Sequence, residues 1–407
     1  MTDEANREAL RRIAAVTPVL TGTARAGDVL RLAEGELGHA GPPFTHPDEI
    51  PPVVLNALAG AVLHEGWAGT AAEAERLIRD GRVRLRPNHD LGTVSPMAGV
   101  VRPSQIVMCV ADANGTGTTF ATLAEAGRRV LRFGVYGPDV AAGLRWLDEE
   151  LGPAMARALP RDGLPILPLI ADGIRLGDDV HQRNVGGMLA FARALPNLDG
   201  PVRSWLLGNP QAFLNTAMAA AKLALDAADG VAGSTIVTAI SRNGAACGIR
   251  MAGTGRRWFT APASLPEGGL FPPHTPDDVQ PDLGDSAIVE AFGLGGTIAH
   301  ASPELAGTMG RAWDEARQAG MRMRALFSDQ HPAFSAVLLG QAGAGLGLDA
   351  ARVVASRTPV RIHTGIAHRD GRTGWIGIGV AQAPLACFQA ATRGLLDTGS
   401  NNGTQDH

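Results

Sequence analysis

Cysteine is scarce in this chain, and its three cysteines lie far apart in the sequence. Cys109, Cys247 and Cys387 stand among apolar residues, and no Cys-x-x-Cys or mixed His/Cys cluster occurs. A structural zinc site usually needs such ligands at short spacing, and a disulfide framework needs several cysteines that pair. We therefore expect neither and predict no metal-binding residues. The sequence implies no cofactor, although a divalent cation remains an open alternative.

Long apolar runs and basic runs are also missing. Residues 1–15 form a charged amphipathic segment without the apolar centre of a secretion signal. The alanine-rich stretch 213–228 contains Asn215, Lys222 and Asp226 and is too short to cross a bilayer. The formal net charge is −4, and basic residues do not cluster with aromatic ones, which argues against nucleic-acid binding. We expect a cytoplasmic protein that binds neither membrane nor nucleic acid.

Apolar residues are plentiful, at 45% of 407 residues, so the chain can bury sizeable cores. Strand-like and helix-like segments do not alternate regularly, which favours an α+β fold over a doubly wound parallel sheet. We expect two mixed α/β domains with a helical middle segment. The predicted parts are an N-terminal α+β domain at 1–125, a mostly helical region at 126–230, a C-terminal α+β domain at 231–396 and a disordered tail at 397–407.

Hydrophobic periodicity and turn residues predict the main elements. Helices are expected at 55–63, 71–78 (capped by Thr70), 144–159, 181–195, 211–228, 303–318 and 384–396. Strands are expected at 106–110, 130–133, 234–240, 248–251, 360–366 and 375–380. The dipeptide Asn243-Gly244 lies between two of these strands and is a strong indicator of a β-hairpin.

Four clusters of polar residues are flanked by glycine, and each has a functional and a structural interpretation. In the first, at 177–184, an acidic pair precedes four hydrogen-bonding side chains: His181, Gln182, Arg183 and Asn184. Donors at the start of a helix suit a carboxylate or phosphate ligand, because the helix dipole is positive there. The structural alternative is an N-cap by Asp178 or Asp179 with a solvated first turn.

The second cluster is the hairpin around Asn243, in which Arg242 and Arg250 lie near opposite ends of the turn. Guanidinium groups can bind a carboxylate or phosphate in bidentate fashion. An ordinary surface hairpin is the alternative.

The third and fourth clusters contain candidate acids and bases. Asp285 can act as a base, a metal ligand or an N-cap, and Glu290 follows it by about one helical turn. The glycine-rich run 293–296 allows backbone N–H groups to approach an anion. His363 and His368 end a predicted strand on opposite faces, so we do not expect them to share a metal ion. Either histidine can transfer a proton singly, or can be a hydrogen-bonded structural residue.

Seven strings in these and neighbouring segments together resemble the AllG, or YlbE-like, family. They are 132–137 (RFGVYG), 181–184 (HQRN), 236–244 (IVTA and RNG), 257–262 (RWFTAP), 284–288 (GDSAI), 364–368 (TGIAH) and 383–388 (APLACF). The resemblance runs from about residue 39 to residue 388, and its specificity comes from unrelated strings in the family order. It implies an α+β fold with two mixed domains and a small helical one.

The resemblance implies a subunit of an oxamate carbamoyltransferase that works with AllF-like and AllH-like subunits. In that reaction oxalurate and phosphate give oxamate and carbamoyl phosphate during allantoin and purine nitrogen catabolism. The alternatives are a non-catalytic scaffold subunit of that complex, or carbamoyl transfer on a different ureido substrate. A homo-oligomer is a further option.

Both substrates are anionic, and attack on the ureido carbonyl places negative charge on its oxygen. Six residues are therefore predicted to bind the substrates: Arg183, Arg242, Arg250, Gln182, Asn184 and Asn243. His181 or His368 is expected to move the proton to the leaving amide nitrogen, and Asp285 is a further catalytic candidate.

Two departures bear on this assignment. Relatives carry a glycine-rich, lysine-ended stretch before the Arg-Phe-Gly string, whereas residues 125–129 here read EAGRR. The chain also lacks the Ser-Thr-Arg-Thr and His-Pro-x-Gln strings of aspartate and ornithine transcarbamylases. Any transcarbamylase activity therefore requires different machinery.

Overall fold

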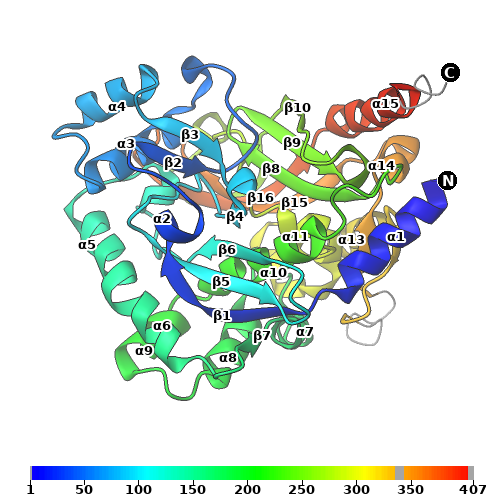
Figure 1. Ribbon diagram of the computed structural model, residues 1–407, viewed down its shortest axis with the longest axis horizontal. Helices are drawn as coiled ribbons and strands as arrows, with labels where there is room; N and C mark the ends of the chain where they lie inside the picture. The colour runs from blue at the N-terminus through cyan, green and yellow to red at the C-terminus, as the bar shows by residue number, and fades with distance from the viewer. Residues whose placement is uncertain (1, 335–342, 402–407) are drawn as a thin grey trace.

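The strands form several separate sheets, most of them with antiparallel pairing. In the computed structural model, which describes residues 2–334 and 343–401, the largest sheet has five strands in the order β4-β6-β5-β1-β7 (Figure 1). These strands are β4 (Thr93–Val94), β6 (Thr118–Thr122), β5 (Ile106–Asp112), β1 (Pro18–Arg25) and β7 (Leu164–Pro165). A parallel pair lies nearby, formed by β2 (Glu36–His39) and β3 (Arg84–Pro87).

The second half of the chain forms three further sheets. A four-stranded sheet has the order β10 (Phe259–Pro262), β9 (Ala246–Met251), β8 (Val237–Asn243) and β12 (Leu283–Gly284). A three-stranded sheet has the order β11 (Glu267–Leu270), β16 (Trp375–Ala383) and β15 (Val360–Ala367). The third is the pair β13 (Phe327–Gln330) and β14 (Gly345–Leu348). Sheets of mixed pairing with helices grouped around them confirm the predicted α+β class.

Helices cover the sheets on several sides. Those before the middle of the chain are α1 (Thr2–Ala15), α2 (Ala26–Val29), α3 (Pro52–His64), α4 (Ala71–Arg79), α5 (Pro138–Trp146), α6 (Gly152–Ala158), α7 (Leu167–Arg175) and α8 (Val185–Ala194). Those after it are α9 (Gly200–Leu207), α10 (Ala212–Asp226), α11 (Ile288–Ala291), α12 (Pro303–Thr308), α13 (Trp313–Arg324), α14 (Ala350–Ser356) and α15 (Leu385–Asn401). Short 3₁₀ or π turns include η3 (Leu131–Phe133), η4 (Leu147–Leu151), η6 (Pro276–Asp278) and η7 (Gly295–Ala301).

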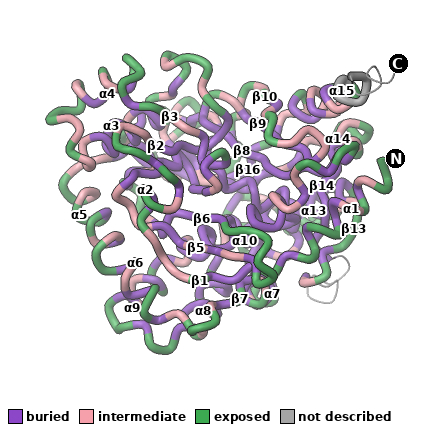
Figure 2. The backbone as a smooth tube through the Cα atoms, viewed as in Figure 1, coloured by how far each residue is buried: buried purple, intermediate pink, exposed green. Residues whose placement is uncertain are grey.

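Helix α10 lies at the centre of the molecule, between the five-stranded and four-stranded sheets (Figure 1). It contacts β4, β5 and β6 on one side and β8 and α11 on the other. Its residues 212–225 are all buried, and alanines make up much of its surface. Small side chains let a helix pack closely against two sheets at once. Figure 2 shows that buried residues are concentrated in the sheets and around this helix.

The N-terminal helix packs against elements from the middle and the later part of the chain. Helix α1 packs against α10 and β14, and it lies on the same side of the molecule as α15 (Figure 1). Asn6 of α1 is buried and donates hydrogen bonds to the side chains of Thr235 (3.0 Å) and Asp349 (3.4 Å). The largest apolar core correspondingly contains residues from 9 to 391.

Several predicted elements are confirmed. Helices α3, α4 and α10 match the predictions, and Thr70 caps α4 by accepting a hydrogen bond from the backbone N–H of Glu73 at 3.2 Å. The predicted hairpin is formed by β8 and β9, which pair antiparallel with Arg242 opposite Cys247. The predicted C-terminal helix continues to Asn401, inside the predicted tail, and residues 402–407 lie outside the described residues.

Other predicted elements are wrong in type or extent. The strand expected at 130–133 is the 3₁₀ turn η3, which ends at Gly134 with φ of 86°. The helix expected at 181–195 begins only at Val185, because residues 181–184 form a loop. The single helix expected at 303–318 is two helices, α12 and α13. In the ranges 2–334 and 343–401, no helix is long and apolar enough to span a membrane.

Candidate active site

A pocket of about 110 Å³ lies where the polar loops of the molecule meet. Its polar side chains are Arg132, His181, Gln182, Asn209, Gln211 and Ser286. Its apolar wall includes Met97, Phe133, Leu214 and Trp375. These residues come from at least five separated segments, so the pocket exists only in the folded chain. An apolar wall with a few converging polar groups is typical of a small-molecule site.

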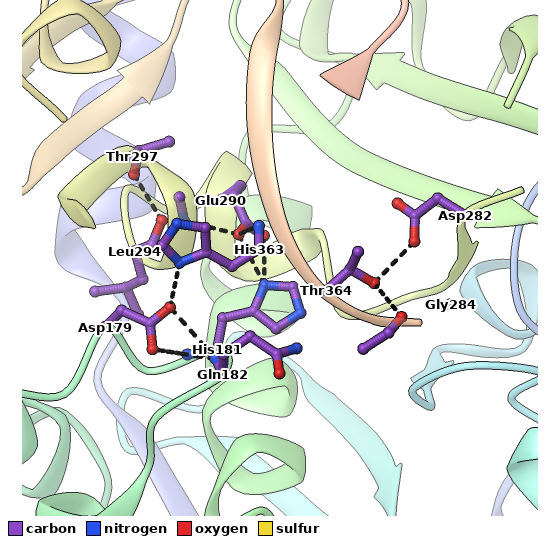
Figure 3. A network of polar contacts seen from close by, with 12 residues as sticks. Asp179, His181, Gln182, Asp282, Gly284, Glu290, Leu294, Thr297, His363 and Thr364 are labelled. Atoms are coloured by element: carbon purple, nitrogen blue, oxygen red, sulfur yellow. Dashed lines mark hydrogen bonds and ion pairs between the residues drawn. The ribbon is translucent and has the colours of Figure 1, made fainter. Parts of the chain in front are cut away.

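His181 is held in this pocket by a buried carboxylate. Its Nδ1 lies 2.7 and 2.9 Å from the two carboxylate oxygens of Glu290, and both side chains are buried (Figure 3). Because a carboxylate accepts hydrogen bonds, Nδ1 carries the hydrogen. The free nitrogen that a pocket ligand meets is therefore Nε2. A histidine oriented in this way is suited to proton transfer.

Asp179 shapes the loop that carries His181. Its carboxylate accepts hydrogen bonds from the successive backbone N–H groups of His181 (3.2 Å), Gln182 (3.1 Å) and Arg183 (2.8 Å). Val180, inside this loop, has φ of 61°. That backbone conformation is a genuine outlier for a β-branched residue, and such strain is concentrated at functional sites. The loop is thus a specific structure built around Asp179, and not the first turn of a helix.

A second histidine connects Asp179 to Glu290. His363 Nδ1 lies 2.6 Å from Asp179 Oδ2, and the backbone N–H of His363 donates to Glu290 Oε1 at 3.1 Å (Figure 3). Burial raises the pKa of Asp179, but the hydrogen bond from His363 and the backbone N–H groups outweigh it, so the net pKa is lowered. Two carboxylate–histidine pairs therefore form one buried network, with His181 as its member in the pocket.

The glycine-rich run after α11 contacts Glu290 of this network. The backbone N–H of Gly296 donates to Glu290 Oε1 at 2.9 Å. At Gly295, φ is 58°, and a Cβ atom would lie 2.1 Å from Glu290 Oε1. No larger side chain fits there. The sequence indicated that these glycines allow N–H groups to approach an anion, and that anion is the carboxylate of Glu290.

Arg132 supplies the guanidinium group of the pocket, and sequence reasoning missed it. It is half-buried; it donates to the backbone oxygen of Glu125, and its Nε has no hydrogen-bond partner among the described residues. Burial lowers the pKa of Arg132, and the Glu125 carboxylate opposes this shift. A partly desolvated guanidinium attracts an anion more strongly than a solvated one. Its position in the Arg-Phe-Gly string was the available indication.

Asn184 and Arg183 belong to the same loop but do not line the pocket. Asn184 Nδ2 donates to the backbone oxygen of His181 and to Gln211 Oε1, both at 2.9 Å. Gln211 Nε2 in turn donates to the backbone oxygen of Gln182 at 2.6 Å. The guanidinium of Arg183 lies 3.8 Å from Asp178 and is partly exposed. Asn184 thus stabilises the loop. Of the four residues predicted from the first cluster, at 181–184, only His181 and Gln182 line the pocket.

The predicted binding residues of the hairpin have protein partners. Arg242 Nε lies 2.6 Å from Asp282 Oδ2, and both side chains are buried. Asn243 Oδ1 accepts hydrogen bonds from backbone N–H groups inside its own turn. Arg250 pairs with Asp90. None of Arg242, Asn243 and Arg250 lines the pocket at His181.

Asp285 is a buried hub of hydrogen bonds. It accepts from Ser241 Oγ (2.5 Å), Asn88 Nδ2 (2.8 Å) and the backbone N–H groups of Ser95 (3.0 Å) and Gly41 (3.1 Å). Burial raises the pKa of Asp285, and these hydrogen bonds oppose the shift. Asp285 does not line the pocket, but the next residue along the chain does. Its contacts are those of a side chain that positions the surrounding loops.

His368 lies outside the pocket, at the end of β15. Its Nε2 is 3.4 Å from Asp278 Oδ1, and its Nδ1 is 2.9 Å from Asp370 Oδ1. His363 and His368 have separate carboxylate partners, Asp179 for the first and Asp278 and Asp370 for the second. Of the two histidines in the fourth cluster, His363 is the one connected to His181.

Asp178 precedes the loop. Its carboxylate is buried, and its hydrogen bonds compensate only in part for the loss of solvation. One carboxylate oxygen accepts from the backbone N–H of Gly187 at 2.8 Å, whereas the other has no hydrogen-bond partner among the described residues. Burial raises the pKa of Asp178 to about 6, and the backbone N–H groups and Arg183 offset this only in part. Folding therefore favours the protonated carboxyl more than the unfolded chain does.

Replacing Asp178 with asparagine is expected to change how stability depends on pH. Because the folded pKa lies above the unfolded value, the stabilising effect of protonation is present below about pH 4 and is lost as pH rises through 6. Between pH 4 and pH 7 the free energy of unfolding of Asp178→Asn should gain about 2–3 kcal/mol relative to the wild type. Urea unfolding at several pH values measures this difference. Parallel pH profiles for the two proteins would refute the expectation.

Comparisons with known proteins agree along nearly the whole chain. The family described as "Oxamate carbamoyltransferase subunit AllG" matches residues 83–286. An Escherichia coli (strain K12) protein named "Oxamate carbamoyltransferase subunit AllG" is 36% identical over 410 residues, covering 97% of this chain and 98% of that protein. "Uncharacterized protein YahG" from the same organism is 32% identical over 405 residues, covering 97% and 86%. A crystal structure of a conserved protein of unknown function from Enterococcus faecalis V583 has a TM-score of 0.93 at 32% identity, with 98% of both chains covered.

Proposed function

The chain belongs to the AllG family, and on that premise we propose that it is a subunit of an oxamate carbamoyltransferase with substrate bound at His181. In the proposed reaction the carbamoyl group of oxalurate is transferred to phosphate, which gives oxamate and carbamoyl phosphate in the catabolism of allantoin and purine nitrogen. AllF-like and AllH-like subunits are the proposed partners. The relative named for this activity supports the assignment, because its similarity covers both chains almost completely.

The proposed reaction requires a proton to move between oxygen and nitrogen. A phosphate oxygen attacks the ureido carbonyl carbon of oxalurate, which forms a C–O bond and places negative charge on the carbonyl oxygen. The C–N bond then breaks, and the amide nitrogen leaves as oxamate once it receives a proton. The proton from phosphate replaces the one transferred. A group that gives and accepts a proton beside this nitrogen lowers the barrier in both directions.

His181 is the proposed proton carrier. Its Nδ1 is engaged by Glu290, so the proton moves at Nε2, the nitrogen left for the pocket. Glu290 also stabilises the imidazolium that forms when Nε2 is protonated. Glu290, Asp179 and His363 act as positioning residues in this proposal, because they hold the imidazole and its loop. They do not touch the substrate.

The anionic ends of the substrates need donors in the same pocket. Arg132 is the proposed partner of a carboxylate or phosphate, and the amides of Gln182 and Asn209 can hold a carbonyl oxygen. This changes the binding set predicted from sequence, in which Arg183, Arg242 and Arg250 had that role. Phe133 and Trp375 form part of the apolar wall of the pocket, and electrostatic interactions are stronger beside apolar surface than in bulk water.

One observation supports the proposal most. Four of the seven strings that identify the family contribute to this single pocket: Arg132 and Phe133 from the first, His181 and Gln182 from the second, Ser286 from the fifth and Gly365 from the sixth. These strings are separated by up to more than two hundred residues. Their convergence on a histidine with a buried carboxylate partner fits a reaction centre better than a scaffold surface.

Replacing Arg132 with glutamine tests the proposed anion contact. The chain is purified alone and with its AllF-like and AllH-like partners, and carbamoyl phosphate formation from oxalurate and phosphate is measured. In the assembled enzyme, kcat/KM for Arg132→Gln should fall about 10- to 100-fold, chiefly through KM, because a hydrogen bond to a charged group is lost.

Arg129→Gln is the matched control, because Arg129 is exposed in the same loop and does not line the pocket. Its kinetics should match those of the wild type. Unchanged kinetics in Arg132→Gln, with an intact complex, would exclude Arg132 from binding. If His181 and Arg132 variants both retain full activity while complex assembly depends on this chain, the chain is a scaffold.

A further inference from the structure

A second histidine–carboxylate cluster lies outside the pocket. In the part of the chain that the structure describes, the side chains of His274, Asp278 and His368 place one ligand atom each within 4.8 Å of one another. Asp278 belongs to η6, and His368 directly follows β15. A backbone bridge between Val279 and His368 joins these two segments. This bridge therefore holds the backbone segments that carry Asp278 and His368 in place.

The distances in this cluster suit a shared cation better than direct hydrogen bonds. His368 Nε2 lies 3.4 Å from Asp278 Oδ1, and His274 Nδ1 lies 3.8 Å from Asp278 Oδ2. Ligand bonds of about 2.0–2.1 Å in a tetrahedral zinc site place neighbouring ligand atoms about 3.3–3.4 Å apart. The separation between His368 and Asp278 matches this value, and the separation between His274 and Asp278, measured to the other carboxylate oxygen, is longer. The two imidazole rings also lie close together, with centroids 5.5 Å apart.

Asp370 lies beside His368 and fixes the position of its ring. The backbone N–H of Asp370 donates to His368 Nδ1 at 3.1 Å, and Asp370 Oδ1 lies 2.9 Å from the same nitrogen, whereas Nε2 faces Asp278. With Nδ1 engaged by the backbone of Asp370, Nε2 is the ring nitrogen that remains for a ligand.

Asp278 keeps an oxygen free for a ligand. Its Oδ2 accepts from the backbone N–H of Thr275 at 2.9 Å and closes the turn before η6. Its Oδ1 has His368 as its near neighbour. One anionic oxygen and two imidazoles form a donor set that suits Zn²⁺, Co²⁺ or Ni²⁺ better than Mg²⁺ or Ca²⁺.

We propose that His274, Asp278 and His368 bind one divalent transition-metal ion, with water as the remaining ligand. The site is partly exposed, which gives the ion an entry path. It does not line the pocket, so the ion takes no part in proton transfer at His181. Instead it ties the 271–279 segment to the end of β15. Phe271 in that segment packs edge-on against Trp375 (ring centroids 5.1 Å apart), and Trp375 forms part of the pocket wall.

Metal binding by the purified chain tests this proposal directly and needs no activity. The metal-free protein is titrated with Zn²⁺ in a calorimeter and with Co²⁺ under a visible spectrometer. One equivalent should bind, and Co²⁺ should give the intense absorption of a four-coordinate site. His274→Ala, Asp278→Asn and His368→Ala should each weaken Zn²⁺ binding at least about tenfold, because three ligands become two.

His46→Ala is the matched control, because His46 Nδ1 also lies beside an aspartate, 3.2 Å from Asp48 Oδ2, on an exposed turn without a second histidine. It should leave the tight equivalent intact. Circular dichroism confirms that each variant is folded before titration. The proposal is overturned if Zn²⁺ binds no more tightly to the wild type than to His368→Ala. It is also overturned if the tight equivalent survives in all three ligand variants.

Discussion

In the assembled enzyme, His181→Gln is expected to reduce kcat/KM for carbamoyl phosphate formation by about 10²- to 10⁴-fold, the usual contribution of a general acid–base residue. Glutamine retains a hydrogen-bonding side chain of similar length, but it cannot carry a proton between phosphate and the leaving nitrogen. Because the loss affects the transition state, it should appear in kcat and not in KM. Steady-state rates with oxalurate and phosphate measure the effect.

The control is His46→Gln, since His46 is exposed and caps a surface turn. Its rate should equal that of the wild type. Substitution at His181 leaves the carboxylate of Glu290 without its imidazole partner, so the assembled complex and its thermal midpoint must be verified in parallel. A folded, assembled His181→Gln enzyme with the wild-type rate would remove His181 from the chemistry.

Arg242→Ala is expected to lower the free energy of unfolding by about 3–5 kcal/mol, because it leaves the buried carboxylate of Asp282 unpaired. Both side chains are almost fully buried, and Arg242 also donates to the backbone oxygen of Gly284. Burial lowers the pKa of Arg242, but the charge of Asp282 and its hydrogen bond outweigh this and raise the pKa. Urea unfolding of the isolated chain measures the loss.

Arg175→Ala provides the comparison for an exposed pair, since Arg175 and Asp172 lie 2.7 Å apart on the surface of α7. Its effect should be below about 1 kcal/mol. If Arg242→Ala does not accumulate as a folded protein, Arg242→Lys measures the same pair with the charge retained. Unchanged stability together with a raised KM would restore the anion-binding role that the sequence suggested for Arg242.

Local patterns in the sequence predicted elements whose cause is local. The cap at Thr70 and the β-hairpin at Asn243-Gly244 depend on residues only a few positions apart, and both are present in the structure. The prediction of a strand at 130–133 is wrong, because a short apolar run has the same sequence pattern in a strand and in a 3₁₀ turn. The left-handed Gly134 marks the turn that the run itself does not reveal.

The site depends on contacts that no local pattern contains. His181 and Glu290 are 109 positions apart, and Asp179 and His363 are 184 apart. The sequence identified Asp179, Glu290 and His363 as polar residues in clusters, but it does not say which clusters meet. Arginines were chosen as anion binders for their charge, although Arg242 is matched by a carboxylate in the fold. Arg132 lines the pocket, and its Nε has no hydrogen-bond partner among the described residues.

The most direct test is a crystal structure of the assembled enzyme with oxamate bound. We expect the oxamate amide nitrogen within hydrogen-bond distance of His181 Nε2 and its carboxylate beside Arg132, between Gln182 and Ser286. Oxamate bound at another part of this chain or only within a partner subunit, with the His181 pocket holding solvent alone, would contradict the account.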